Sequence, residues 1–147
     1  MTAKQSRWCV SIGLVALALL TGLSSDGFSQ ADKGRVFLKQ KLKIPYALRD
    51  GSTVLKPDEY TLKIQNEGGT PVLTFLSKEG EPLLRSRGEN DSVPEKERDI
   101  KNGGRLRIMV VPDSKHPGGR LIVFVYDFIE RFGTFVRLRF RIAEATE

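Results

Sequence analysis

The chain has 147 residues, with 24 basic and 18 acidic side chains, one cysteine and a formal net charge of +6 at neutral pH. This length suits one domain of ordinary size and excludes a multidomain protein or a polytopic membrane protein. The chain begins with Lys4 and Arg7, an uncharged apolar run at 10–23 and small residues that end at Ala31, which is the organisation of a secretory signal peptide. We therefore predict a signal peptide at 1–31 and one domain at 32–147.

Removal of this segment leaves a mature chain that is still basic and has no cysteine. Lys4, Arg7 and Asp26 leave with it, so 22 basic and 17 acidic residues remain, with a net charge of about +5. Cys9 also leaves, so neither a disulfide nor a cysteine-bound metal is expected. We expect no transmembrane segment in the mature chain, since even the run at 10–23 is shorter than the roughly 20 residues of a spanning helix.

Short segments of alternating apolar and polar residues, separated by turn residues, run through the mature chain. The predicted strands are 36–44, 46–48, 53–55, 60–64, 72–76, 82–86, 105–111, 121–126 and 134–142. Asp50-Gly51 predicts a tight hairpin, because glycine supplies the positive φ that such a turn requires. The uninterrupted apolar run at 121–126 is typical of a central strand that is buried on both faces.

Two segments depart from this alternation. Residues 88–104 are charged and predict a long mobile loop, with at most one helical turn after Pro94. Residues 128–133 predict a turn in which Phe128 and Phe132 are the most exposed aromatic side chains. The mature chain contains no amphipathic helix of useful length. The fold class is therefore all-β, a single antiparallel β-sandwich or small open barrel of about eight short strands after a cleaved N-terminal signal helix.

Residues 44–62 carry a recognisable strand-turn-strand pattern. Ile44-Pro45-Tyr46, the turn at Asp50-Gly51 and the Pro-x-x-Tyr of Pro57–Tyr60 resemble a pattern in small exported bacterial β-proteins of uncharacterised function. Lys56, Asp58 and Glu59 stand where that pattern has Leu, Ala and Gly, and the spacing to the tyrosine is one residue shorter. The resemblance implies an envelope β-domain, periplasmic or secreted, and carries over no catalytic residue.

Basic side chains recur on the outward faces of three predicted strands. They are Lys39, Lys41, Lys43, Arg105, Arg107, Arg137, Arg139 and Arg141. Because the planar guanidinium group suits phosphate and carboxylate, these ladders are candidates for binding an anionic envelope polymer or a lipid headgroup. A protein partner also stays open, whereas nucleic acid is not expected for an exported protein. The alternative is that these charges only protect edge strands, which the first and last strands of a sandwich often are.

Asp113, Ser114 and His116 lie close together on one predicted loop. They suggest an alternative function, a small hydrolase or metal-dependent enzyme that uses the His116 loop with the acidic residues of 88–104. A triad needs groups that converge from separate elements, and one histidine cannot build a zinc site without carboxylate help. A polar turn is the preferred interpretation, with no catalytic residue, metal or cofactor. The predicted function is a non-enzymatic exported envelope protein, acting as a binding or structural β-module.

Overall fold

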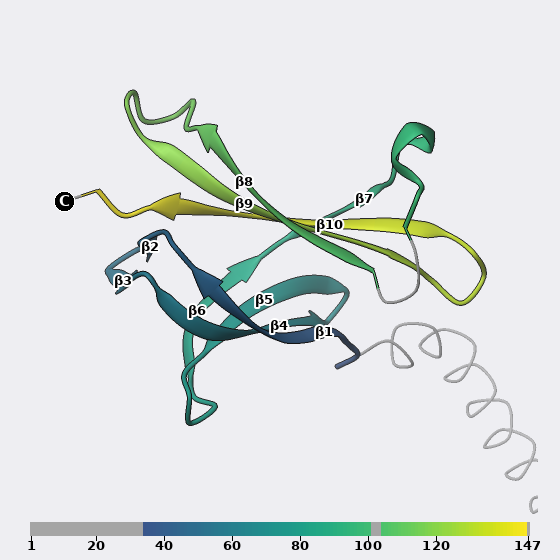
Figure 1. Cartoon of the computed structure of the whole chain (residues 1–147), viewed down its shortest axis with the longest axis horizontal. Helices are drawn as coiled ribbons and strands as arrows, with labels where there is room; N and C mark the ends of the chain where they lie inside the picture. Colours follow the sequence, from purple (N-terminus) through teal and green to yellow (C-terminus); the bar gives the residue numbers. More distant parts are fainter. Residues whose placement is uncertain (1–33, 101–103, 147) are drawn as a thin grey trace, which may run out of the picture. The chain divides into compact units, whose positions relative to one another are not determined.

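Alternating residues of the chain assemble into two antiparallel sheets. The computed structural model describes residues 34–100 and 104–146, which form ten strands and one 3-10 helix (Figure 1). These are β1 (Val36–Ile44), β2 (Leu48–Asp50), β3 (Thr53–Leu55), β4 (Asp58–Glu67), β5 (Thr70–Leu76), β6 (Pro82–Arg87), β7 (Glu89–Ser92), η1 (Glu95–Glu97), β8 (Arg105–Pro112), β9 (Arg120–Ile129) and β10 (Phe135–Glu144). The predicted all-β sandwich is confirmed.

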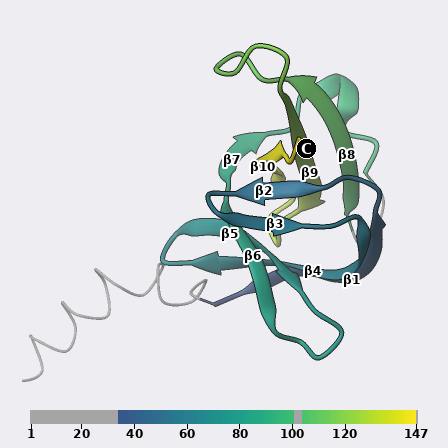
Figure 2. The ribbon, with the colours of Figure 1, turned by 90° about the vertical axis from the view of Figure 1, so that its left-hand side faces the viewer.

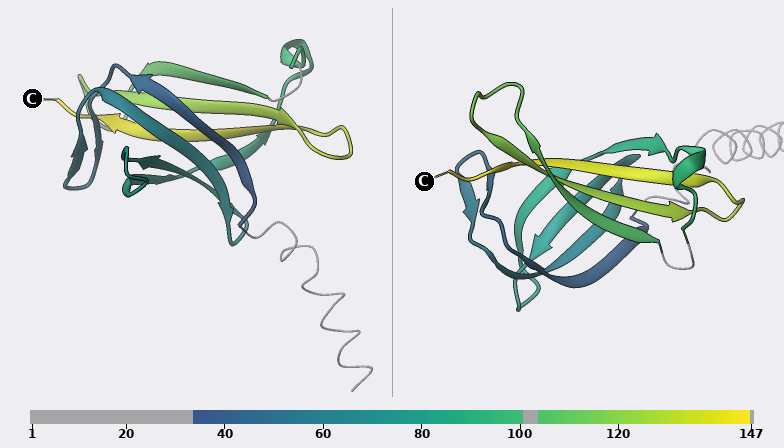
Figure 3. Two further views of the ribbon diagram at one scale, coloured as in Figure 1. Left: turned by 60° about the horizontal axis from the view of Figure 1, so that its bottom comes forward. Right: turned by 45° about the horizontal axis from the view of Figure 1, so that its top comes forward.

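The two sheets divide the chain unequally. The first sheet, sheet A, has the strand order β1-β4-β5-β6. The second, sheet B, has the order β3-β2-β10-β9-β8, and β7 also pairs with β10. Figure 3 shows the sheets as two layers, with β8, β9 and β10 in one and β1, β4, β5 and β6 in the other. All pairings are antiparallel, so neighbouring strands can be joined by short turns.

The core lies between the two sheets and is filled by inward-facing apolar residues of every strand except β7. Phe124 of β9 packs edge-on against Phe75 of β5, with ring centroids 5.5 Å apart. Leu138 and Phe140 of β10 are buried beside them. Val125 is also buried although it faces away from this core, so β9 is a central strand buried on both faces, as the apolar run predicted. Each such side chain contributes roughly 1.5–3 kcal/mol through removal of apolar surface from water.

The chain passes from sheet A to sheet B at Gly88. β6 pairs with β5, and after this single residue β7 pairs with the first half of β10 (Figure 1). The Gly88 N–H donates to the carbonyl of Pro71, with an N to O distance of 2.8 Å. A Cβ at this position would lie 2.5 Å from Cε1 of Phe140 and 2.8 Å from the carbonyl oxygen of Arg139. The corner therefore has room only for glycine.

Several sequence-based boundaries were wrong, each because a tertiary partner overrides local pattern. β7 lies inside the segment that we predicted as a loop, since pairing with β10 recruits a polar stretch into sheet B. β9 continues to Ile129, so Phe128 is buried and only Phe132 of the two predicted aromatics is exposed. The last strand is not an edge, because β10 has partners on both sides, whereas β1 is one.

Two further expectations concern membranes and export. Within residues 34–100 and 104–146, no helix has both the length and the apolar character that crossing a membrane requires. The predicted signal peptide at 1–31, with Cys9, lies outside the described residues.

Candidate anion-binding groove

The eight predicted basic residues lie in different surroundings. Lys39, Lys41 and Lys43 are exposed on the outer face of β1 in sheet A. The five arginines, Arg105, Arg107, Arg137, Arg139 and Arg141, extend from the outer face of sheet B. The lysine and arginine ladders thus face opposite sides of the sandwich and do not form one surface.

Three of the arginines surround one buried carboxylate. Asp127 is fully buried and Arg137 is only 6 % exposed. Arg137 donates to both carboxylate oxygens of Asp127, from Nε at 2.8 Å and from Nη2 at 3.1 Å. Arg105 and Arg107 donate to Oδ2 of the same carboxylate, at 3.1 and 3.3 Å. A buried carboxylate needs such partners, since burial of an unpaired charge is strongly unfavourable.

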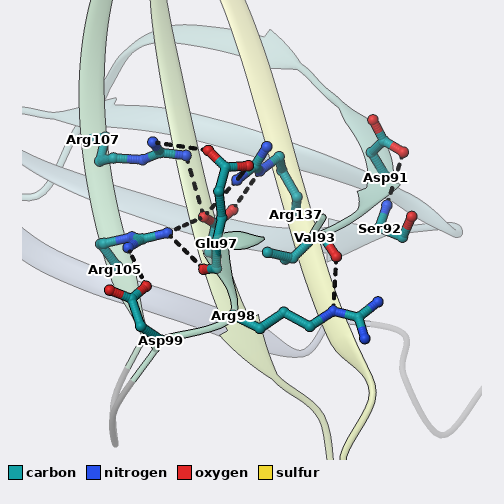
Figure 4. Close-up of polar contacts among 10 residues, drawn as sticks. Asp91, Ser92, Val93, Glu97, Arg98, Asp99, Arg105, Arg107 and Arg137 are labelled. Carbon is teal, nitrogen blue, oxygen red and sulfur yellow. Dashed lines mark hydrogen bonds and ion pairs between the residues drawn. The ribbon is translucent and has the colours of Figure 1, made fainter. Parts of the chain in front are cut away.

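The segment 93–100 covers this cluster. The side chain of Val93 is buried at the start of this segment. Glu97 accepts a hydrogen bond from Nη2 of Arg137 at 3.1 Å and lies 3.9 Å from Arg107. Figure 4 shows Glu97 among Arg105, Arg107 and Arg137. Asp99 pairs with Arg105 at 2.9 Å. Three cations therefore meet three anions, which leaves little charge for an external ligand.

The arginines set the ionisation of Asp127. Burial alone would raise the pKa of Asp127, but hydrogen bonds from Arg137 and Arg105, with the charges of Arg137 and Arg107, hold the pKa below its usual value. The hydrogen bond to Asp127 correspondingly raises the pKa of Arg137. Asp127 and Arg137 therefore form an ionised pair at neutral pH.

The depressed pKa of Asp127 predicts a loss of stability in acid. A group with a lower pKa in the folded state stabilises the protein above its unfolded pKa, roughly 3.9 for aspartate, and this contribution is lost as the pH falls through the folded pKa. We expect the free energy of unfolding, measured in urea at stepwise lower pH, to fall in this range. The fall should be smaller in Asp127→Asn, and parallel curves for the two proteins would contradict this origin.

A groove opens where β6 of sheet A lies beside β2 and β10 of sheet B. Figure 2 shows the β2–β3 hairpin next to β6. On β10, pairing with β7 ends at Arg139 and pairing with β2 begins at Ala143, so between them this edge of β10 has no strand beside it, and Arg141 and Ile142 line the groove there. Its volume is about 830 Å³. The lining residues are Arg49, Asp50, Gly51, Glu67, Val72, Leu84, Arg85, Ser86, Arg87, His116, Arg141, Ile142 and Ala143.

Positive charge exceeds negative charge along this groove. Four arginines line it against two carboxylates, Asp50 and Glu67. Glu67 pairs with Arg85, and Arg141 pairs with Glu89 at 2.7 Å. Among residues 34–100 and 104–146, no carboxylate pairs with Arg49 or Arg87, and both side chains are exposed. These two guanidinium groups are therefore free to bind a phosphate or carboxylate.

Sequence reasoning found only one of the groove arginines. Arg141 was one of the predicted basic residues of the last strand. Arg139, two residues before it, does not line the groove; it is half-buried and has no carboxylate partner in the described part of the chain. Arg85 and Arg87 alternate on β6 in the same way as the arginines of β10, which was an available signal. Arg49 carries no such pattern, since β2 has only three residues.

His116 lies at the rim of the groove but is not enclosed by it. Its Nδ1 lies 3.0 Å from Oδ2 of Asp113, yet 79 % of its side chain is exposed. A hydrogen bond from the backbone N–H of Lys115, with a smaller effect of His116, lowers the pKa of Asp113. Glu97 and Asp99 of the acidic segment lie at the Arg105 end of β8, whereas His116 follows the opposite end. The structure does not bring His116 and these carboxylates together.

Comparisons with known proteins add no function to this geometry. No family model, no curated protein and no solved structure matches the chain.

Proposed function

We propose that the protein is a non-enzymatic binding module of the cell envelope, which holds an anionic polymer in the groove between β6, β2 and β10. The observation that carries this proposal is a pair of arginines in the lining of one groove, Arg49 and Arg87, neither of which has a carboxylate partner in the described part of the chain. Export, which the signal-peptide pattern at 1–31 predicts, would place the groove among phosphate- and carboxylate-bearing envelope polymers.

The groove supports binding better than the outer strand faces do. Each guanidinium group can form charge-assisted, forked hydrogen bonds to an oxyanion, and a concave wall limits how much water screens them. The lysines of β1 are exposed on an open face, where one charge contributes little to affinity. Arg105, Arg107 and Arg137 already pair with Asp127. Arg141 pairs with Glu89, so we place the anion contacts at Arg49 and Arg87.

Loss of the two free arginines should weaken binding more than loss of two exposed lysines. We expect Arg49→Ser/Arg87→Ser to reduce affinity for fluorescently labelled polyphosphate or polygalacturonate at least about tenfold, because each lost charge-assisted hydrogen bond costs about 1.5–3 kcal/mol. The control Lys41→Ser/Lys43→Ser removes the same charge from β1 and should change affinity little. Fluorescence anisotropy at low and physiological salt measures both. Equal weakening by the two variants, or no binding of either polymer by the unaltered protein, would refute the groove as the site.

A further inference from the structure

Strand β8 forms an open edge of sheet B, since β9 is its only partner among the strands that the structure describes. Just beyond the two strands, the N–H of Asp113 donates to the carbonyl of Gly119. Backbone groups of an antiparallel strand point to its two sides at alternate residues, so those of Leu106, Ile108 and Val110 point away from β9. Within the described part of the chain, no hydrogen bond reaches these groups. β8 therefore offers backbone donors and acceptors to another strand.

The other sheet edges carry features that discourage pairing with another chain. β1 has Lys39, Lys41 and Lys43 on its outer face and a register shift near its start. β3 and β7 have only three and four residues, and β6 begins with Pro82. β8 has eight residues in a regular register and no lysine, and its only proline, Pro112, is its last residue. Of the edges that the structure describes, β8 is therefore the least protected.

Apolar side chains are partly exposed along β8. Met109 is 38 % exposed and Val110 is 36 % exposed, on opposite faces of the strand. Leu106 and Ile108 pack against the core but are only partly buried. The two arginines of β8 do not block the edge, because both point to Asp127 of the neighbouring strand β9. A further strand beside β8 would remove some of this apolar surface from water, which is favourable.

The free backbone groups of β8 match those of a second copy of the same strand. An antiparallel pair with a two-fold axis at Ile108 sets Leu106 opposite Val110 of the second copy, and Ile108 opposite its own equivalent. These are the residues whose backbone groups point outward, so all of them can form hydrogen bonds in one register. Such an interface is self-complementary, and each of its contacts occurs twice.

The charges of β8 also allow this pairing. In the register about Ile108, Arg107 lies opposite Met109 of the second copy and Arg105 lies opposite Val111, so no arginine directly faces another. The equivalent antiparallel pairing of β1 would set lysine opposite lysine, which is unfavourable. A second copy of the chain is therefore compatible with β8 and not with β1.

We propose that two copies of the protein associate through β8, so that sheet B continues from one copy into the other. Addition of a strand to an open sheet edge is a common mode of protein recognition, in which main-chain hydrogen bonds supply the affinity. The pairing of two eight-residue strands is smaller than a permanent interface requires, so the dimer should dissociate on dilution. This inference is independent of the groove.

Substitution of Met109 tests the outer face of this pairing. Met109→Lys sets a lysine opposite Arg107 twice, because the two-fold axis repeats the contact. We expect the Kd of the dimer, measured by sedimentation velocity over a range of protein concentrations, to rise about tenfold. Met109→Glu sets a carboxylate opposite the same arginine and should keep or lower the Kd. Because this side chain is more than a third exposed, both variants should retain the unaltered protein's unfolding transition.

A cysteine at position 109 tests the register. Cys9 is the only cysteine, so Cys9→Ser/Met109→Cys carries one thiol. In the proposed register the two copies of this thiol lie on a diagonal of about 7–8 Å, which a short bismaleimide spans. We expect a covalent dimer from this protein and little from the control Cys9→Ser/Val54→Cys, whose thiol is at an exposed position of β3.

Three results would overturn the proposal. They are a protein that stays monomeric at every concentration, an equal Kd for Met109→Lys and Met109→Glu, and equal cross-linking of the two cysteine proteins. The first would favour a strand of a different protein as the partner of β8. Arg49→Ser/Arg87→Ser should dimerise like the unaltered protein, which separates this test from that of the groove.

Discussion

Replacement of Asp127 by asparagine is expected to lower the free energy of unfolding by about 3 kcal/mol. The variant removes the anion that four guanidinium hydrogen bonds share, while Arg137 stays buried at 6 % exposure. Removal of one partner from a buried ion pair leaves the other charge uncompensated, which costs about 3–5 kcal/mol. We take the lower end because Arg105 and Arg107 are each about a third exposed and can regain water.

The matched control is Asp99→Asn in the same cluster. The Asp99 side chain is 80 % exposed, so its pair with Arg105 should contribute less than about 1 kcal/mol. Urea unfolding at neutral pH compares the two variants with the unaltered protein. If the free energy of unfolding falls by the same small amount in both variants, the burial of Asp127 is not what makes this cluster important for stability.

Replacement of Gly88 by alanine is the second large effect and should cost about 3 kcal/mol. The added Cβ would overlap Cε1 and Cδ1 of Phe140, at 2.5 and 2.6 Å, and approach the carbonyl oxygen of Arg139 at 2.8 Å. Phe140 is fully buried and cannot turn aside without moving its neighbours. Overpacking of a filled core costs about 1–3 kcal/mol, and a clash with backbone adds to it.

Gly119→Ala is the matched control for Gly88→Ala. Both glycines lack a positive φ, but the nearest contact of a Cβ at 119 is 3.1 Å, to the carbonyl oxygen of His116 in an exposed loop that can adjust. Thermal unfolding followed by circular dichroism should show a large decrease in Tm for Gly88→Ala and a small one for Gly119→Ala. A Gly88→Ala protein with an unchanged Tm would show that the corner between the sheets is looser than its contacts imply.

The alternation of apolar and polar residues predicted the strands that pack against the core, but it did not predict where these strands continue through polar residues. β1 begins and ends where the alternation of 36–44 placed it, because one face must be buried. β9 was predicted to end at residue 126, where the uninterrupted apolar run ends, but it continues through Asp127 to Ile129. Arg137 lies directly opposite Asp127 on β10, and this pairing allows the strand to continue with its carboxylate buried.

The groove could not be predicted because its walls are distant in the sequence. β2, β6 and β10 each contribute arginines, and no local pattern says that these strands will lie side by side. β7 has no apolar periodicity, and only its partner β10 makes it a strand. Charged residues at alternate positions were recognisable, but whether each has a carboxylate partner depends on the tertiary structure. In the sequence, Arg105, Arg107 and Arg137 therefore resemble binding residues, whereas in the structure they share Asp127 as a partner.

The position of β10 has a consequence for when the protein can fold. β10 pairs with β2, β7 and β9, so the β2–β3 and β8–β9 pairs are not joined into one sheet, and β7 has no strand to pair with, until residues 135–144 have been synthesised. The strands of sheet A all lie between residues 36 and 87 and can pair earlier on the ribosome. Pairing of distant segments is slow, because the chain must close a long loop before the contacts form. Sheet B therefore cannot be completed until residues 135–144 have been synthesised, whereas sheet A can form before them.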